Sequence, residues 1–264
     1  MLQNNYNNKI ENKISNEFLK KGYLIFNIKN LIKLKRIKNE IKKYIKLKIH
    51  KKASIENLHH FVSPKNLNSK RMSLYSKLNS KEEFLKSYYE FGKEYLQIIC
   101  GNELVMQRKV NLSIQLSNDD SSLLPLHSDV WSGCSPFEVV LWIPMVNCKK
   151  TNSMYILSRK DNDKFYEKIH QFSDVTKLEK KVLKKAKFLN IKFGQGLIFQ
   201  HSMMHGNIVN REKNTRISFN CRFKSVFSPY DTKAIGETFK PITLKPSSIL
   251  GMKYNDPKVK KIRF

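Results

Sequence analysis

Two histidines and one aspartate have the residue types and the spacing that metal chemistry requires. His127 and Asp129 are two positions apart, so an extended backbone places both side chains on one face. A surface or capping aspartate is the alternative reading of this pair. His205 lies far downstream, directly before Gly206. Because two imidazoles and one carboxylate can hold iron(II) on one triangular face and leave the other positions open, His127, Asp129 and His205 are the candidate metal ligands and catalytic residues.

An arginine beyond His205 strengthens this interpretation. Residues 210–214 form a polar stretch that predicts a turn, and Arg216 and Ser218 follow it. A hairpin with its turn centred there would place Arg216 directly across from His205. An arginine beside iron suits 2-oxoglutarate, which chelates the metal through one carboxylate and its keto oxygen and leaves the other carboxylate for a bidentate cation. Ser218 shares the strand face of Arg216 and could add a hydroxyl contact.

A second downstream histidine competes with His205 for the role of metal ligand. His201 and His205 are four residues apart and would share a face of one strand. His205 is favoured because His201 would lie four residues farther from the turn, about 13 Å along the strand. Gly206 also permits the close backbone approach expected beside a metal and its chelate. We therefore predict that His201 points into the interior of the same β-barrel as His205, either deeper than His205 or toward the rim. There it would be a supporting or substrate-side group.

The segments around these residues resemble those of a known family. The pattern His-x-Asp, His and Arg-x-Ser resembles that of the iron(II)/2-oxoglutarate-dependent oxygenases. More narrowly, four stretches resemble phytanoyl-CoA-hydroxylase-like oxygenases that occur sporadically in surface-carbohydrate biosynthesis clusters: LPLHSDVWSGCSPFEVVLWIPMVNC, SMYIL, HGNIVN and TRISFNCRFKSVFSPY. The resemblance covers roughly residues 105–255, and His201 is a departure from it.

The resemblance implies a fold, a chemistry and a substrate class. It implies a double-stranded β-helix that binds iron(II) through His127, Asp129 and His205. It also implies 2-oxoglutarate as cosubstrate, held by Arg216 and Ser218, with O₂ as the oxidant. The implied substrate is a sugar or sugar conjugate, nucleotide-linked compounds included, that is hydroxylated or oxidised in surface polysaccharide or related carbohydrate biosynthesis. The alternative is a non-catalytic metal- or carbohydrate-binding jelly roll, which would form no succinate with any substrate.

Several further side chains are candidates for cosubstrate or substrate contacts. If the strand before the His-x-Asp pair lines the pocket, Gln115 points inward with Asn111 and Ser113 and is a candidate cosubstrate contact. Trp142 is expected in the core, with a substrate platform as the alternative. Candidate substrate contacts, with surface or capping roles as the alternative, are Glu138, Trp131 and Arg71. Histidines without a carboxylate at ligand spacing, which we place outside the site, are His50, His59, His60 and His170.

Length and composition indicate one large domain, residues 1–264. The chain has a mass of 31.1 kDa and 40% hydrophobic residues, enough for a sizeable core. The N-terminus lacks a signal-peptide pattern and the longest apolar run, 139–146, is too short to span a bilayer, so we expect a soluble cytoplasmic protein. The four cysteines form no Cys-x-x-Cys pair, which favours reduced thiols.

The formal charge of +28 raises the question of nucleic-acid binding. Only eight of the 50 basic residues are arginine, and the lysines are spread along the whole chain. Arginine is the usual reader of base edges and the better bidentate phosphate partner, so a diffuse lysine excess indicates solvated surface and no specific nucleic acid. The positive field would help to attract an anionic small-molecule substrate. The sequence gives no oligomeric state.

The hydrophobic periodicity predicts an N-terminal, mostly helical layer over residues 1–104. Helices are expected at 7–21 and 30–48, with a short strand at 23–26 between them and a loop at 61–79. Ser80 and Glu83 would form a capping box that opens another helix, which would end at Gly101.

From residue 105 the pattern changes to strands, which predicts a jelly-roll core over residues 105–255. A charged helical insertion at about 160–188 interrupts it, and a basic tail follows at 256–264. In the last strand, Asn220 and Arg222 would face inward with Arg216, while the apolar residues between them face outer helices. The expected fold is therefore mainly β with flanking helices, a double-stranded β-helix of cupin-like type. The expected strands are 111–116, 137–146, 153–157, 190–193, 196–205 and 215–224.

Overall fold

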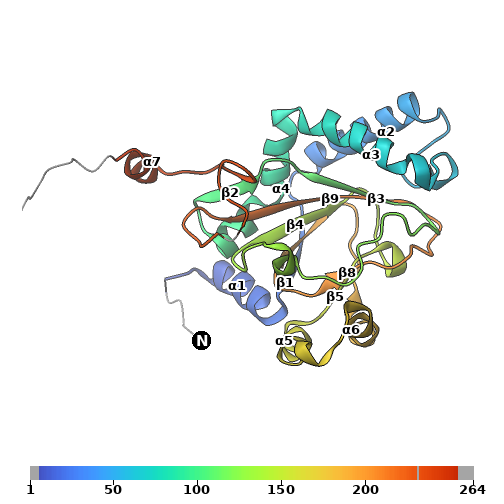
Figure 1. Cartoon of the computed structure of the whole chain (residues 1–264). Coiled ribbons are helices and arrows are strands. Elements are labelled where there is room, and N and C mark those ends of the chain that lie inside the picture. The colour runs from blue at the N-terminus through green and yellow to red at the C-terminus, as the bar shows by residue number, and fades with distance from the viewer. Residues whose placement is uncertain (1–5, 231, 255–264) are drawn as a thin grey trace, which may run out of the picture.

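The computed structural model describes residues 6–230 and 232–254, so the predicted basic tail at 256–264 lies outside the described residues. Figure 1 shows helices α2, α3 and α4 together on one side of the molecule, and helices α5 and α6 beside a small sheet on the other. Within the described ranges, no helix is both long enough and apolar enough to cross a membrane.

The first two helices form where the sequence predicts them. Helix α1, Lys9–Lys21, begins with a capping box in which Asn8 accepts from backbone N–H groups and Glu11 returns the contact. It ends at Gly22, which has a left-handed φ of 77°. Helix α2 spans Leu31–Lys48, and its buried residues follow the predicted apolar stripe: Leu34, Ile37, Ile41, Tyr44 and Ile45.

The predicted loop at 61–79 is wrong, because this segment forms helix α3, Pro64–Asn79. Proline at its first turn is compatible with a helix start. The predicted capping box is also wrong: Ser80 ends α3 and its hydroxyl donates to the Lys77 carbonyl at 3.0 Å. Helix α4 instead begins one residue after Lys81, spans Glu82–Cys100 and ends at Gly101 as predicted.

Antiparallel strands form two sheets. The larger sheet has the strand order β1-β7-β4-β9-β2-β10, with β3 also paired to β9. Its strands are β1 Tyr23–Asn27, β2 Leu104–Gln107, β3 Asn111–Gln115, β4 Val139–Pro144, β7 Gln195–Gln200, β9 Arg216–Ser225 and β10 Phe239–Pro241. The smaller sheet has the order β6-β5-β8, from β5 Tyr155–Ile156, β6 Lys187–Phe188 and β8 His205–Gly206.

Several predicted elements need correction. The predicted strand at 196–205 is broken after Gln200, and His205 belongs to β8 of the other sheet. The predicted strand at 190–193 is absent from the described strands, where Ile191 makes an isolated bridge to Cys148 and β6 lies earlier. The charged insertion is helical, as predicted, with α5 Arg159–Glu167 and α6 Val175–Val182. Elements that the pattern did not predict are β2, β10, α7 Pro246–Met252 and the short 3₁₀ turns Leu58–His60, Asp129–Ser132, Lys150–Asn152 and Ile169–Gln171.

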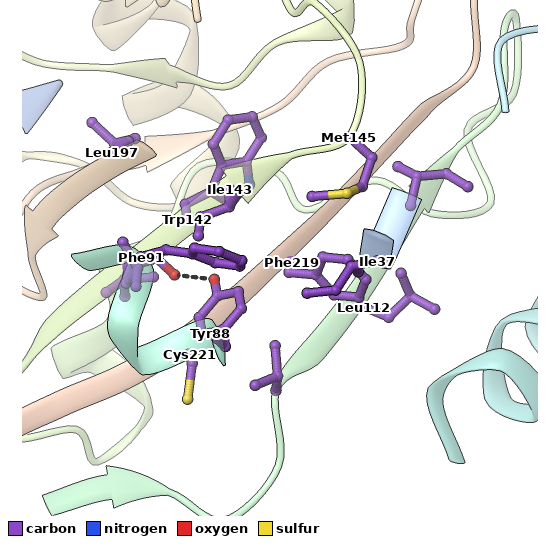
Figure 2. Close-up of a cluster of buried hydrophobic side chains, with 14 of the residues drawn as sticks. Ile37, Tyr88, Phe91, Leu112, Trp142, Ile143, Met145, Leu197, Phe219 and Cys221 are labelled. Atoms are coloured by element: carbon purple, nitrogen blue, oxygen red, sulfur yellow. Dashed lines mark hydrogen bonds between the residues drawn. The ribbon is translucent and has the colours of Figure 1, made fainter. Parts of the chain in front are cut away.

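The alternation predicted for the last strand is confirmed on its apolar face. Phe219 of β9 packs edge-on against Phe84 and Tyr88 of α4, with ring centroids 5.4 and 6.3 Å apart. The Tyr88 hydroxyl donates to the Leu141 carbonyl of β4 at 2.7 Å, which pins the helix to the sheet (Figure 2). This face of the large sheet is therefore closed by helices, and the opposite face is left to line a cavity.

Candidate active site

The two predicted histidine ligands lie side by side, although they come from distant parts of the chain. The backbone N–H of His127 donates to the His205 carbonyl, and the N–H of His205 donates back to the His127 carbonyl, each at 2.9 Å. The two imidazole ring centroids are 4.2 Å apart. This reciprocal pair of hydrogen bonds is the closely spaced pairing of an antiparallel bridge, and it fixes the two side chains next to each other.

Both imidazoles are held so that one nitrogen stays available. Nδ1 of His127 lies 2.8 Å from the Pro125 carbonyl, and Nδ1 of His205 lies 2.8 Å from the Met203 carbonyl. A carbonyl can only accept, so each Nδ1 carries a proton, and in the neutral form of either ring Nε2 keeps its lone pair. Burial, together with neighbouring His127, lowers the pKa of His205 to about 4, so its ring is neutral near neutral pH.

Asp129 opens a short 3₁₀ turn directly after the histidine bridge and is buried. Its Oδ1 accepts from Nη2 of Arg222 at 2.9 Å, and Nε2 of His201 lies 4.0 Å from its Oδ2. Burial opposes ionisation, but His205, His201 and Arg222 together hold the pKa of Asp129 well below its usual range. Arg222 is charged at any ordinary pH. It is therefore the cation that keeps Asp129 ionised when the imidazoles of His201 and His205 are neutral.

A cavity of about 610 Å³ brings the predicted site residues together. Its walls come from the inner face of the large sheet, from the small sheet and from helix α3. The predicted inward residues Asn220 and Arg222 are on the wall, as is Trp142, which is also buried in the core. Other predicted site residues that line it are His127, Asp129, His205, Arg216, Asn111, Ser113 and Arg71.

The guanidinium of Arg216 is buried and has few polar partners to offset its charge. Its side chain is 2% exposed, and its one hydrogen bond in the described structure is a long contact of 3.4 Å from Nη2 to the hydroxyl of Ser113. Nε and Nη1 have no hydrogen-bond partner among the described residues. Burial lowers the pKa of Arg216, and only the Cys148 thiol opposes this. A buried cation of this kind is costly unless an anion completes the pocket.

The predicted hairpin register is wrong. His205 pairs with Ile156 in the small sheet, whereas Arg216 pairs with Gln115 in the large one. The two residues therefore come from different sheets and both line the cavity, but they are not opposite each other on one hairpin.

Ser218 and Gln115 lie beside Arg216, outside the described lining of the cavity. Ser218 is fully buried and its hydroxyl has no hydrogen-bond partner among the described residues. Gln115 donates from Nε2 to the Ile208 carbonyl at 2.6 Å, and its Oε1 is likewise unpartnered. Both can add polar contacts next to the guanidinium of Arg216.

Solved structures that are similar to this chain, at low sequence identity, include three non-heme enzymes. They are the non-heme monooxygenase ThoJ in complex with nickel, the non-heme alpha-ketoglutarate-dependent carbocyclase SnoK from nogalamycin biosynthesis, and HygX from Streptomyces hygroscopicus with nickel and 2-oxoglutarate bound. Their TM-scores are 0.51, 0.52 and 0.52, at 15%, 10% and 11% identity. They cover 89%, 90% and 85% of this chain, and 85%, 97% and 89% of their own.

This chain shares their fold. No protein-family model matches the sequence. No curated protein matches it either. The function must therefore be inferred from the chemistry of the site residues.

His201 lies close to Asp129, with 4.0 Å between its Nε2 and Oδ2 of Asp129. The prediction that His201 and His205 lie on one strand is wrong, because β7 ends at Gln200. His201 follows the break after β7 and is fully buried, with Nδ1 3.3 Å from Oε2 of Glu138. Cys134 completes a buried cluster whose donor atoms lie within 4.8 Å of one another. Nζ of Lys233 lies 2.6 Å from the Cys134 sulfur, so a cation already occupies one side of the cluster. His201 is not part of the described cavity wall, which favours His205 as the ligand.

The other residues considered in the sequence lie outside the cavity wall. Glu138 is fully buried, so the role predicted for it as a substrate contact is replaced by one in this cluster. Trp131 is 37% exposed and packs edge-on against Tyr166 of the insertion. His59 faces Thr215, its Nδ1 3.0 Å from the hydroxyl. The histidines that were predicted to lie outside the site are absent from the described cavity wall: His50, His59, His60 and His170.

Sequence reasoning missed that the charged insertion supports the segment that carries the predicted ligands His127 and Asp129. Glu179 of α6 accepts from the backbone N–H of Leu126 at 3.0 Å and from the Tyr155 hydroxyl at 2.6 Å. Tyr166 of α5 donates to the hydroxyl of Ser128, which stands between the two predicted ligands, at 2.8 Å. Because these partners are remote in sequence, no local pattern could have revealed them.

Proposed function

We propose that this chain is an iron(II)- and 2-oxoglutarate-dependent oxygenase that hydroxylates or oxidises a sugar or sugar conjugate, nucleotide-linked sugars included, in carbohydrate biosynthesis. The observation that carries the proposal is the uncompensated buried guanidinium of Arg216, which shares one cavity with two imidazoles and a carboxylate. The shared fold with iron and 2-oxoglutarate enzymes is consistent with it. The proposal takes the two sheets as the halves of a double-stranded β-helix.

The donor set fits iron(II). His127 and His205 each present Nε2, because a backbone carbonyl occupies Nδ1 of both rings. Asp129 supplies the carboxylate, and its contact with Arg222 through Oδ1 leaves Oδ2 for a metal. Two imidazoles and one carboxylate would hold iron on one face, with open positions toward the cavity. The carbonyl contacts fix the tautomer and the orientation of each ring.

The surroundings of Arg216 fit the distal carboxylate of 2-oxoglutarate. A guanidinium donates to a carboxylate through two parallel N–H bonds, and Arg216 has Nε and Nη1 without partners in the described structure. The unpartnered hydroxyl of Ser218 can donate to the same carboxylate. Gln115, paired across the strands from Arg216, can hold the guanidinium or the cosubstrate in place.

Iron and 2-oxoglutarate, when bound, supply the oxidising power with dioxygen, and they release succinate and carbon dioxide. The chain provides orientation and charge. Arg222 keeps Asp129 ionised, Arg216 fixes the far end of the cosubstrate, and the cavity wall between them holds the substrate. Amide and hydroxyl side chains on that wall suit a polyhydroxylated substrate: Asn68, Asn111, Asn207, Asn220, Ser121 and Ser122.

The spectrum of the iron complex tests the ligand set. Iron(II) with 2-oxoglutarate under anaerobic conditions should give the weak visible charge-transfer band of a chelated keto acid, and Asp129→Ala should remove it. Asp120→Ala, which changes an exposed aspartate nearby, is the matched control. An unchanged band in Asp129→Ala would show that the ligand set is wrong.

Succinate formation tests catalysis. Wild-type protein with iron(II) and 2-oxoglutarate should form succinate faster when one member of a panel of sugars, glycans and nucleotide sugars is added. Failure to form succinate with any member, despite a normal iron and 2-oxoglutarate band, would favour the non-catalytic binding protein. The cytoplasmic location and the lack of specific nucleic-acid binding stay predictions from the sequence.

A further inference from the structure

A third arginine lies on the cavity wall, and the proposed roles of iron and 2-oxoglutarate do not use it. Arg71 stands on α3, which packs against β3 of the large sheet. Together with Asn68, one turn earlier, it forms the polar part of the helix face that lines the cavity. Helix α3 therefore forms a part of the cavity wall that the strands do not form, and Arg71 places a cation there.

The hydrogen-bonding capacity of Arg71 is only partly used. Its Nη1 donates to the Leu112 carbonyl at 3.3 Å and its Nη2 donates to Oδ1 of Asn68 at 2.6 Å. A guanidinium has five N–H donors, and both of these acceptors are neutral. The ion pairs of the described residues include none with Arg71. Arg71 thus has donors and an unneutralised charge available for a ligand.

The charge balance of the cavity indicates what that ligand is. The described wall carries three guanidinium groups, of Arg71, Arg216 and Arg222, and one carboxylate, of Asp129. Iron(II) and the 2-oxoglutarate dianion carry equal and opposite charges, so the loaded cavity keeps an excess of two positive charges. An uncompensated charge in a partly buried site is unfavourable, so a substrate with two negative charges fits best.

We propose that Arg71 binds a phosphate group of the substrate, so that the substrate class is a phosphorylated sugar or sugar nucleotide. A phosphate ester carries about 1.5 to 2 negative charges near neutral pH and accepts the planar fork of an arginine bidentately. Asn68, whose Oδ1 faces Arg71, keeps its amide N–H₂ as a further donor. The assignment rests on the proposed function for its charge balance, because that balance counts iron and 2-oxoglutarate as bound.

A purely structural role is the competing explanation, since Arg71 also ties α3 to β3 through the Leu112 carbonyl. Two substitutions separate the explanations. Arg71→Gln keeps an amide donor for that carbonyl and removes the charge, whereas Arg71→Lys keeps the charge and removes the fork. Arg36→Gln, on the exposed side of α2, removes an equal charge outside the cavity and is the matched control.

The experiment is calorimetric titration of the iron- and 2-oxoglutarate-loaded protein under anaerobic conditions. The probes are inorganic pyrophosphate and glucose 1-phosphate, with glucuronate as a carboxylate probe and glucose as a neutral one. Wild type should bind both phosphate probes more tightly than glucuronate or glucose. Arg71→Gln should weaken phosphate binding about 10- to 100-fold, with a smaller loss in Arg71→Lys and none in Arg36→Gln.

Several outcomes would overturn the assignment. Equal pyrophosphate affinity in Arg71→Gln and wild type would do so, as would tighter binding of glucuronate than of the phosphates, or no phosphate binding by wild type. Thermal unfolding of each variant shows whether it is folded, and Arg71→Lys keeps the test valid if Arg71→Gln does not fold. The iron and 2-oxoglutarate band of wild type separately reports the proposed function. If that band is missing, the same titration on metal-free protein still decides whether Arg71 binds phosphate.

Discussion

Replacing Arg216 by methionine should have opposite effects on the free protein and on the complex with 2-oxoglutarate. Methionine keeps an unbranched side chain of similar length and removes the charge. In the free protein the guanidinium is 2% exposed and two of its nitrogens have no partner among the described residues. Removing an uncompensated buried charge should therefore raise the free energy of unfolding of the ligand-free protein by about 1 to 4 kcal/mol.

The complex should respond in the other direction. Wild-type protein gains charge-assisted hydrogen bonds from Arg216 to the distal carboxylate, and Arg216→Met would leave that carboxylate buried without its cation. The loss should be about 2 to 4 kcal/mol of binding free energy, or about a 30- to 1000-fold higher Kd for 2-oxoglutarate. Iron binding should be largely retained, because Arg216 is not among the proposed metal ligands.

Two measurements on the same samples test this reasoning. Urea unfolding without ligand gives the stability change, and calorimetric titration of 2-oxoglutarate into the iron-loaded protein under anaerobic conditions gives the affinity. Arg211→Met, which changes an exposed arginine in the polar turn before β9, is the control and should alter neither value. Equal 2-oxoglutarate affinity in Arg216→Met and wild type would refute the assignment of the cosubstrate pocket.

Four other substitutions give separable results. His205→Ala should abolish iron binding and 2-oxoglutarate turnover, whereas His201→Ala should retain iron binding, as measured by metal titration. Gly206→Ala should lower iron affinity about 10- to 100-fold in the same titration, because a Cβ there would lie 2.6 Å from the Tyr155 hydroxyl and would displace the ligand strand. Tyr88→Phe should lower the free energy of unfolding by about 0.5 to 1.5 kcal/mol in urea, because it removes a buried hydrogen bond between α4 and β4.

Each of these expectations has a result that contradicts it. Loss of iron only in the His201 variant would reverse the ligand choice. Wild-type iron affinity in Gly206→Ala would mean that the backbone beside His205 has room to relax. Tyr6→Phe, at a fully exposed tyrosine, is the control for Tyr88→Phe. Equal stability of the two variants would show that the hydroxyl of Tyr88 does not stabilise the fold.

Which residues gather at the cavity could be predicted from the sequence better than their geometry. The spacing of His127 and Asp129 is local, and a two-residue period has the same meaning wherever the chain is extended. The relation of His205 to Arg216 is not local. It depends on where the chain leaves one sheet for the other, and this happens between Gln200 and His205.

The reason for that break is visible in the packing of two adjacent methionines. Met203 is buried in the main core and also contacts the turn at Gly22, whereas Met204 is buried in the small cluster under the insertion. Consecutive residues that fill different clusters look like a continuous apolar strand in the sequence. Only the folded chain shows that it changes sheets there.

Helix α3 was missed for a related reason. Its buried residues include Leu67, Leu74 and Leu78, and most positions between them are lysine, asparagine or serine. The apolar stripe is narrow because only one face of the helix packs against β3, and another face lines the cavity with Asn68 and Arg71. A helix whose polar side faces a binding cavity gives a weak amphipathic signal.

The attachment of α5 and α6 to the ligand segment has a consequence for protein engineering. Glu179 and Tyr166 reach from these helices to the residues on either side of His127. If His127 and Asp129 hold the metal as proposed, an exchange of this insertion between proteins of the same fold would alter metal retention together with any change in substrate preference. Libraries designed for new substrates should hold both side chains constant and vary the cavity wall of α3, where Arg71 donates to Leu112 and Asn68 and not to the segment around His127.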